Sequence, residues 1–344
     1  MTQYLRPIVV TGPDTRGDDL SLAGGWCRFR EVEVLERGKP RGQIVSARDI
    51  PADQLQRLTA PRVPFAGIAM TYPSLMGILN VTPDSFSDGG QHDAPEQAGA
   101  RAREMLAEGA DIIDMGGEST RPGALEVAAD LELARLAPVI EALRAKGMDV
   151  PISVDTRKAS VGQAAMAAGA EVINDVSAFQ FDPALADVAA QTGAGVVLMH
   201  SIGLPETMQQ DATSAYSDVI FDVYDALEER AALAVSKGIA RERIMIDPGI
   251  GFGKTDPHNL ALLERLSLFH ALGCPILLGV SRKGMIGRLA GVEAADQRGA
   301  ASAAVGLWAI SQGIQMLRVH DIEIHRQMIA LWMASSGVAG EMSR

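Results

Sequence analysis

The sequence predicts an α/β protein made of a (β/α)8 barrel, of the kind called a TIM barrel, which follows a β-rich N-terminal extension. Three observations support this fold class. Eight short apolar runs recur at regular spacing after residue 74. Before seven of them a Gly closes an Ala- and Leu-rich segment, as glycine does at the left-handed end of a helix. Each run ends in a polar side chain, and the carboxyl ends of barrel strands share one face.

The apolar runs predict the strands. They are rich in Ile, Val, Leu and Met and do not alternate with polar residues, which is typical of parallel strands buried on both faces. They begin near residues 75, 112, 151, 171, 195, 243, 275 and 315. The mean spacing of about 34 residues is common for one strand–helix unit. An open, doubly wound sheet is the alternative arrangement of such units.

The segments between the runs predict the helices. In 96–109, the residues Ala98, Ala102 and Met105 have the spacing of one helical face. Segments 214–238 and 257–273 have a similar pattern. The predicted barrel domain therefore spans residues 75–335.

Residues 1–74 form the predicted N-terminal extension, which differs from the barrel in charge. The extension holds 10 basic and 8 acidic residues, whereas the rest of the chain holds 21 and 35. Val32, Val34 and Leu35 precede the turn sequence Gly-Lys-Pro, as in a strand that enters a turn. The sequence assigns this extension no task.

Composition excludes several classes of protein. The chain has 344 residues, of which 47% are hydrophobic and 22% charged, so it can bury a large core. Its net charge of −12 disfavours a nucleic-acid partner. Cys27 and Cys274 are far apart and form no disulfide framework, and the first residues lack a signal-peptide pattern. With no apolar stretch long enough for a membrane span, we expect a cytoplasmic protein without a membrane partner.

The strand ends carry the candidate functional residues. They are Asn80, Asp114, Asp155, Asn174 with Asp175, His200, Asp247, Ser281, and Arg318 with His320. Any one of them could cap the next helix, at about even odds. Polar side chains at all eight ends favour a ligand-binding rim.

Two Gly-, Ser- and Pro-rich loops follow the first two strands, with the sequences MGILNVTPDSFSDGG (76–90) and DIIDMGGESTRPG (111–123). Further motifs follow in order: ISVDTRK, VINDVS, LMHSIG, IMIDPGIGFGKT, GVSRKGMIG and LRVHD. Together they cover about residues 75–325 and closely resemble the dihydropteroate synthases. That family has the (β/α)8 fold already inferred, and sulfonamides compete with one of its substrates. Its reaction joins 4-aminobenzoate to 6-hydroxymethyl-7,8-dihydropterin pyrophosphate, with Mg²⁺ assisting.

The resemblance implies roles for individual residues. The implied pterin-binding residues are Asp155, Asn174, Met199, Asp247, Phe252, Lys283 and Arg318. The implied pyrophosphate contacts are Asn80, Arg318 and His320, with Asn80 also a ligand of Mg²⁺. The implied aminobenzoate contacts are Phe86, Thr120, Arg121, Pro122, Ser281 and Gly284.

The chemistry that suits these residues is dissociative. Mg²⁺, Arg318 and His320 stabilise the departing pyrophosphate, and Lys283 donates to an acceptor atom of the pterin. Asp88, or alternatively Asp84, stabilises a pterin methylene cation. The aromatic amine is already neutral, so positioning and electrostatics carry the rate. A purely structural alternative is a buried salt-bridge network of Lys283 with Asp155 and Asp247.

The string GIGFGKT (249–255) resembles a phosphate-binding P-loop, but Pro248 occupies the place of its first Gly. We also expect Asp256-Pro257 not to continue into a helix, as a P-loop would.

Two other functions remain as alternatives: a methyltransferase of the related pterin-binding barrels, and a non-catalytic pterin-binding paralogue. The small-residue-rich segment 294–313 packs on the barrel or on a second subunit, and we expect a homodimer.

Overall fold

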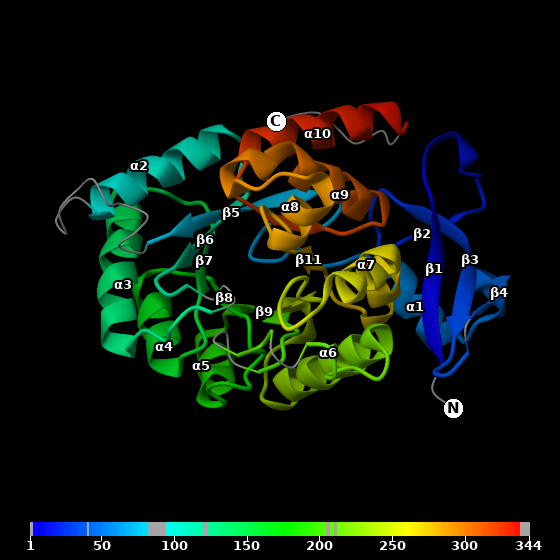
Figure 1. Cartoon of the computed structure of the whole chain (residues 1–344), viewed down its shortest axis with the longest axis horizontal. Coiled ribbons are helices and arrows are strands. Elements are labelled where there is room, and N and C mark those ends of the chain that lie inside the picture. The colour runs from blue at the N-terminus through cyan, green and yellow to red at the C-terminus, as the bar shows by residue number, and fades with distance from the viewer. Residues whose placement is uncertain are drawn as a thin grey trace.

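A barrel of eight parallel strands forms the centre of the computed structural model (Figure 1), which describes residues 3–39, 41–81, 94–119, 123–203, 207–209 and 212–337. The strands lie in the order β10-β9-β8-β7-β6-β5-β12-β11. A bridge between Ile246 and Ile276 closes the ring between β10 and β11. The strands are β5 (Ser74–Asn80), β6 (Ile112–Gly116), β7 (Ile152–Asp155), β8 (Val172–Asp175), β9 (Gly195–Met199), β10 (Ile244–Asp247), β11 (Leu277–Leu278) and β12 (Met316–Val319). The predicted fold class is confirmed, and each strand begins within two residues of its predicted start.

Helices surround this barrel. They are α2 (Ala94–Ala107), α3 (Ala129–Ala145), α4 (Ala159–Ala168), α5 (Ala184–Thr192), α6 (Val219–Ser236), α7 (Asp256–Glu264), α8 (Gly284–Ala290), α9 (Gly299–Ser311) and α10 (Ile322–Ser335). Gly169 and Gly193 end α4 and α5 with φ of 110° and 68°, the left-handed conformation that the glycine pattern predicts. No helix in the described part of the chain is both long and apolar enough to cross a membrane.

Helix α7 corrects two expectations. The segment 257–273 is not one helix, because α7 ends at Glu264 and a 3-10 helix, η5 (Leu266–Leu272), follows. The expectation that Asp256-Pro257 does not lead into a helix is wrong, because α7 begins at Asp256. Thr255 caps it by accepting a hydrogen bond from the backbone N–H of His258, and the first helical turn tolerates proline since its N–H needs no partner there.

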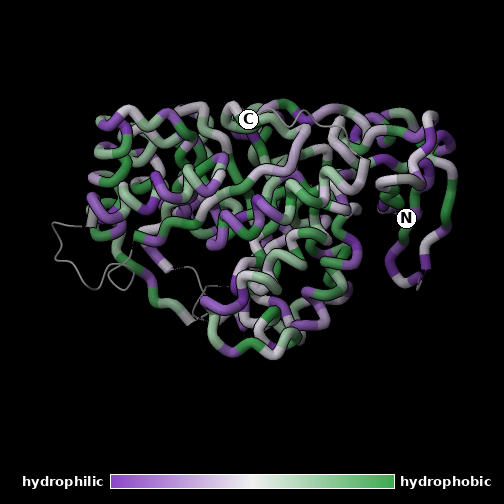
Figure 2. Tube along the Cα trace, turned by 90° about the horizontal axis from the view of Figure 1, so that it is seen from above, coloured by the Kyte–Doolittle hydropathy of each residue, from purple (hydrophilic) through white to green (hydrophobic). Residues whose placement is uncertain are grey.

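The N-terminal extension forms a small antiparallel sheet and a short helix. Strand β3 (Arg28–Leu35) pairs with β1 (Tyr4–Val10), β2 (Leu20–Ser21) and β4 (Gln43–Ser46), and helix α1 (Ala52–Thr59) follows. Figures 1 and 2 both show this sheet at one end of the molecule. Buried hydrogen bonds join it to the barrel, because Trp26 Nε1 donates to the carbonyl of Ile310 at 2.8 Å and Ser267 Oγ donates to that of Pro7 at 2.9 Å.

The chain between α1 and β5 closes the amino-terminal end of the barrel. Phe65, Ile68 and Met70 are buried there, with Phe65 only 1% exposed. They form one cluster with barrel residues Met76, Ile112, Val172, Val197, Met245, Leu277 and Met316. A Cβ atom added to Gly195 would lie 3.1 Å from the Phe65 ring, so the ring packs directly against the backbone of β9. The end of the extension is therefore the floor of the barrel core.

Candidate active site

A cavity of about 870 Å³ opens at the carboxyl ends of the strands. Among its lining residues are all eleven predicted site residues that the structure describes: Asn80, Asp155, Asn174, Met199, Asp247, Phe252, Ser281, Lys283, Gly284, Arg318 and His320. The predictions for Asp84, Phe86, Asp88, Thr120, Arg121 and Pro122 lie outside the described residues. Side chains from seven strands or the turns after them thus meet in one cavity.

Arg318, on β12, lies at the centre of this cavity's charges. Its Nε donates to Oδ2 of Asp114 at 2.6 Å and its Nη2 donates to Oδ2 of Asp155 at 2.9 Å. The side chain of Arg318 is 20% exposed, whereas that of Asp114 is fully buried. The two carboxylates fix the plane of the guanidinium group while leaving part of it open to the cavity.

Asp114 is a residue whose role sequence reasoning missed. Besides Arg318, its carboxylate accepts hydrogen bonds from Ser153 Oγ at 2.6 Å and from Asn174 Nδ2 at 3.1 Å. It therefore orients two predicted ligand contacts, Arg318 and Asn174, without lining the cavity itself. The sequence signal that could have indicated this role is the position of Asp114 at the end of a barrel strand.

Asp155 presents an acceptor without a partner. Its Oδ1 is buried and forms no hydrogen bond with any described residue. Burial raises the pKa of Asp155, and the positive charge of Arg318 opposes that rise. A buried carboxylate oxygen without a donor is costly, so a ligand that donates a hydrogen bond here is expected to bind well.

Asp247, the last residue of β10, is a second buried carboxylate at the cavity floor. Its Oδ1 accepts a hydrogen bond from the backbone N–H of Gly249 at 2.7 Å. Burial raises its pKa, and the positive charge of Lys283 opposes the rise. The two carboxylates at the floor, with Asn174 between their strands, provide acceptors for the amino and N–H groups of a flat heterocycle.

Lys283, in the turn after β11, also lines the cavity. Its amino group donates to the carbonyl of Ile250 and sits 4.2 Å from the centre of the Phe252 ring. Burial of that amino group lowers the pKa of Lys283 to about 7, and the negative charge of Asp247 opposes the shift.

The salt-bridge network expected as the structural alternative is wrong. Lys283 forms no ion pair with Asp155 or Asp247, all three being among the described residues; Asp155 pairs with Arg318 instead. Lys283 therefore acts on Asp247 only at longer range.

A different lysine, Lys254, fastens the Gly-rich loop after β10. Its amino group donates to the carbonyls of His200, Gly249 and Phe252 at 3.2, 2.9 and 3.0 Å and lies 3.0 Å from His200 Nδ1. Gly249 has a φ of 68°, and a Cβ there would lie 1.9 Å from the carbonyl oxygen of His200, so glycine is required. The loop holds Phe252 at the cavity wall. Lys254 binds these three carbonyls, whereas the lysine of a P-loop would bind a phosphate.

Four buried charges support the other side of the cavity. The carboxylate of Glu118, which lines the cavity, accepts hydrogen bonds from Arg157 at 2.9 Å and from Lys158 at 2.6 Å. Lys158 also donates to Glu132 at 2.7 Å. The sequence motifs contain Glu118, Arg157 and Lys158 but not Glu132, and nothing in their spacing pointed to this pairing.

The fold and the cavity define a (β/α)8 barrel whose strand ends bring buried carboxylates and cationic side chains together at one ligand site. A family model described as "Pterin binding enzyme" matches residues 76–320. Dihydropteroate synthase of Escherichia coli is 46% identical over 254 residues, which are 74% of this chain and 88% of that relative. The chain belongs to the pterin-binding enzymes, and within them to the dihydropteroate synthases.

Two further relatives agree with this placement. The structure of Xanthomonas albilineans dihydropteroate synthase with 4-aminobenzoic acid has a TM-score of 0.74 and 46% identity, and the match covers 79% of this chain and 97% of that one. A probable bifunctional folylpolyglutamate synthase/dihydropteroate synthase of Haloferax volcanii is 47% identical over 262 residues, or 76% of this chain. This chain spans only 30% of the length of that bifunctional relative.

Proposed function

We propose that the protein joins 4-aminobenzoate to 6-hydroxymethyl-7,8-dihydropterin pyrophosphate and releases 7,8-dihydropteroate and pyrophosphate. The observation that carries this proposal is that three groups line one cavity: Asp155, whose buried Oδ1 has no hydrogen-bond partner among the described residues, and the cations Arg318 and Lys283. The acceptor suits the donor edge of a pterin, and the cations suit the pyrophosphate attached to it.

The pterin lies on the cavity floor in this proposal. Asp155 and Asp247 accept hydrogen bonds from its amino and N–H groups, and Asn174, held by Asp114, adds an amide. Met199 and Phe252 line the same cavity as apolar walls for the ring. The backbone carbonyl of Phe252 accepts a hydrogen bond from Lys254, so this wall of the cavity is preformed.

The pyrophosphate lies nearer the rim in this proposal, against Arg318 and His320. These residues are two positions apart at the end of β12, so their side chains point to the same face. Asn80 is the candidate ligand for Mg²⁺. Its side chain is half-buried at the cavity wall, and Gly116 lies beside its Oδ1 without a side chain to cover it. No group of three acidic, His or Cys ligands occurs among the described residues, so the fit is to Mg²⁺ bound mainly by phosphate oxygens and water. Bound there, the ion would neutralise charge on the leaving pyrophosphate.

The chain's own contribution to catalysis is electrostatic and positional. Arg318 places a fixed positive charge where negative charge develops on the departing oxygen. Carbonyl and carboxylate groups already hold Lys283 and Arg318 in place, so little reorganisation accompanies the reaction. Gly284 at the rim offers a backbone N–H for the aminobenzoate carboxylate. The first two loops, with Asp88 or Asp84 near the cation and Phe86, Thr120, Arg121 and Pro122 around the aminobenzoate, complete the site in this proposal.

A direct assay tests the function. Purified protein with Mg²⁺, the pterin pyrophosphate and 4-aminobenzoate should release pyrophosphate in step with 7,8-dihydropteroate, and a sulfonamide should raise the apparent KM for 4-aminobenzoate. Absence of pyrophosphate release at saturating substrates, together with tight binding of the pterin, would favour a non-catalytic pterin-binding protein. Transfer of a methyl group from methyltetrahydrofolate would favour the methyltransferase alternative.

The pH profile should depend on Lys283. Because the pKa of this cation is lowered to about 7, its positive charge is present below that pH and is lost as the pH rises through it. We expect kcat/KM for the pterin pyrophosphate to fall on the alkaline side of pH 7, and we expect that limb to disappear in Lys283→Met. Lys237→Met is the matched control, since Lys237 pairs with Asp187 on the surface. An unchanged alkaline limb in Lys283→Met would contradict this assignment.

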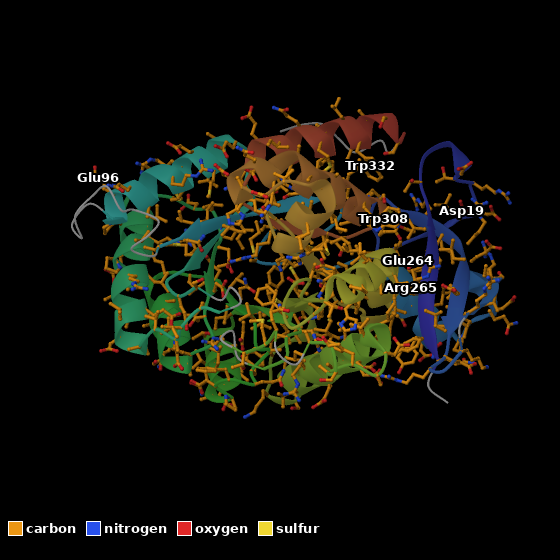
Figure 3. The ribbon with its side chains drawn as sticks, viewed as in Figure 1. Asp19, Glu96, Glu264, Arg265, Trp308 and Trp332 are labelled. Carbon is orange, nitrogen blue, oxygen red and sulfur yellow. The ribbon has the colours of Figure 1, made fainter. Side chains whose placement is uncertain are left out.

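We further propose that the protein works as a homodimer in the cytoplasm. Large apolar side chains are exposed on the neighbouring helices α9 and α10: Trp308 is 45% exposed and Leu331 is 73% exposed. Figure 3 labels Trp308 and Trp332 on these two helices. Burial of such side chains against a second copy is favourable, and light scattering at several concentrations measures whether the dimer forms.

A further inference from the structure

Two side-chain links join the turns that follow β11 and β12. At the first link, the backbone N–H of His320 donates to Ser281 Oγ at 3.1 Å, and the same oxygen lies 3.0 Å from Nδ1 of the His320 ring. At the second link, Arg282 Nε donates to Asp321 Oδ2 at 2.9 Å. Consecutive residues on one turn therefore hold consecutive residues on the other.

The first link bears on which nitrogen of the neutral His320 ring carries hydrogen. A serine hydroxyl has one hydrogen and two acceptor positions. The backbone N–H of His320 occupies one acceptor position, and the hydroxyl hydrogen can point to Nδ1, which then acts as acceptor. In the neutral ring the hydrogen is then on Nε2.

We propose that Ser281 is a positioning residue for His320: it fixes the ring in the tautomer with hydrogen on Nε2, so that this N–H donates to the pyrophosphate. This inference rests on the proposed function of the cavity. It replaces the expectation that Ser281 contacts the aminobenzoate, because its hydroxyl is committed to His320. Both residues line the cavity, and Ser281 is 7% exposed.

The second link explains why this geometry is stable. Arg282 has a φ of 58°, a left-handed conformation that non-glycine residues rarely adopt. Its guanidinium bonds to Asp321, and its backbone N–H donates to Ser302 Oγ at 2.9 Å. These contacts hold the backbone that aims Ser281 at His320 and Lys283 into the cavity.

Nitrogen NMR of ¹⁵N-histidine-labelled protein above the pKa of the ring tests the tautomer directly. The His320 signal, assigned with His320→Gln, should report hydrogen on Nε2 in the wild type. In Ser281→Ala it should move to a mixture of the two tautomers, and Ser281→Thr should restore the wild-type signal. A signal from hydrogen on Nδ1 in the wild type, or one that Ser281→Ala leaves unchanged, would overturn the proposal. This measurement needs no turnover, so it stands even if the assay for the proposed function fails.

Kinetics separate a positioning role from a general loosening of the turn. Ser281→Ala should weaken inhibition by inorganic pyrophosphate, and raise KM for the pterin pyrophosphate, by about 10-fold, as expected for one well-oriented hydrogen bond. KM for 4-aminobenzoate should stay unchanged. Ser302→Ala is the matched control, because it removes a buried hydroxyl of α9 that accepts a hydrogen bond from the same turn, at Arg282. Equal effects in both variants, or an effect confined to 4-aminobenzoate, would contradict the role of Ser281.

Discussion

Replacing Arg318 with Met is expected to lower kcat/KM for the pterin pyrophosphate by about 1,000-fold, because a preorganised charge at the leaving group is lost. The same change should lower the free energy of unfolding by about 3–5 kcal/mol, since it leaves buried carboxylates without their cation. Arg318 binds Asp114 at 2.6 Å and Asp155 at 2.9 Å, and both acids are almost fully buried. Steady-state kinetics and urea unfolding measure the two effects.

The two effects of Arg318→Met can be separated. In the double variant Arg318→Met/Asp114→Asn, one of the two carboxylates left without a cation becomes neutral. Part of the lost stability should therefore return, while activity stays low. Arg318→Lys should fall between, because an ammonium keeps the charge but cannot reach two carboxylates as a fork does.

Arg326→Met is the matched control for Arg318→Met. Arg326 pairs with Asp111 at 2.8 Å, is partly exposed and does not line the cavity. Activity should be unchanged and the stability loss should stay near 1 kcal/mol. If Arg326→Met reduced kcat/KM as strongly as Arg318→Met, the role of Arg318 at the leaving group would be refuted.

The sequence predicts the strand-end residues well but cannot sort them by role. Asp155 and Asp175 both end barrel strands, yet only Asp155 lines the cavity. The carboxylate of Asp175 accepts hydrogen bonds from the backbone N–H groups of Ser177 at 2.7 Å and Phe179 at 2.6 Å, so it stabilises its own turn. Turn formation and ligand binding select the same residue types, and the direction of the side chain decides between them.

The two lysines of the site illustrate the same limit. Lys254 and Lys283 each follow a Gly-containing strand end, and both are near the cavity. Lys254 has its amino group surrounded by three carbonyl oxygens of its neighbourhood, whereas Lys283 faces the Phe252 ring. These surroundings depend on loop geometry and on residues of other strands. The sequence resemblance assigned Lys283 to the site, but it gave no role to Lys254.

The task of the extension's last residues also depends on distant parts of the chain. Phe65, Ile68 and Met70 show no periodic pattern, and their partners come from seven different strands. No local sequence signal encodes such a contact, because the barrel floor exists only after the strands have closed. Residues 1–74 therefore had no predictable role, although the structure makes their end part of the barrel core.

Replacing Phe65 with Ala should lower the free energy of unfolding by about 3–5 kcal/mol, the usual cost of removing a large buried ring. The ring is 1% exposed and packs against Gly195 at the start of β9, where little can move into the space it leaves. At low temperature, where the variant remains folded, kcat should be close to that of the wild type, because the cavity lies at the opposite end of the strands. Urea unfolding and kinetics on the same preparation measure both quantities.

Val63→Ala is the control for Phe65→Ala, since Val63 belongs to the same segment but is 53% exposed. Its cost should be below about 0.5 kcal/mol. A loss below about 1 kcal/mol in Phe65→Ala would mean that the barrel floor is sealed without the extension. If instead both the large loss and the preserved kcat are found, the two ends of the same strands have separate tasks. The amino ends then hold the barrel together through a segment that precedes it, and the carboxyl ends carry the buried charges of the active site.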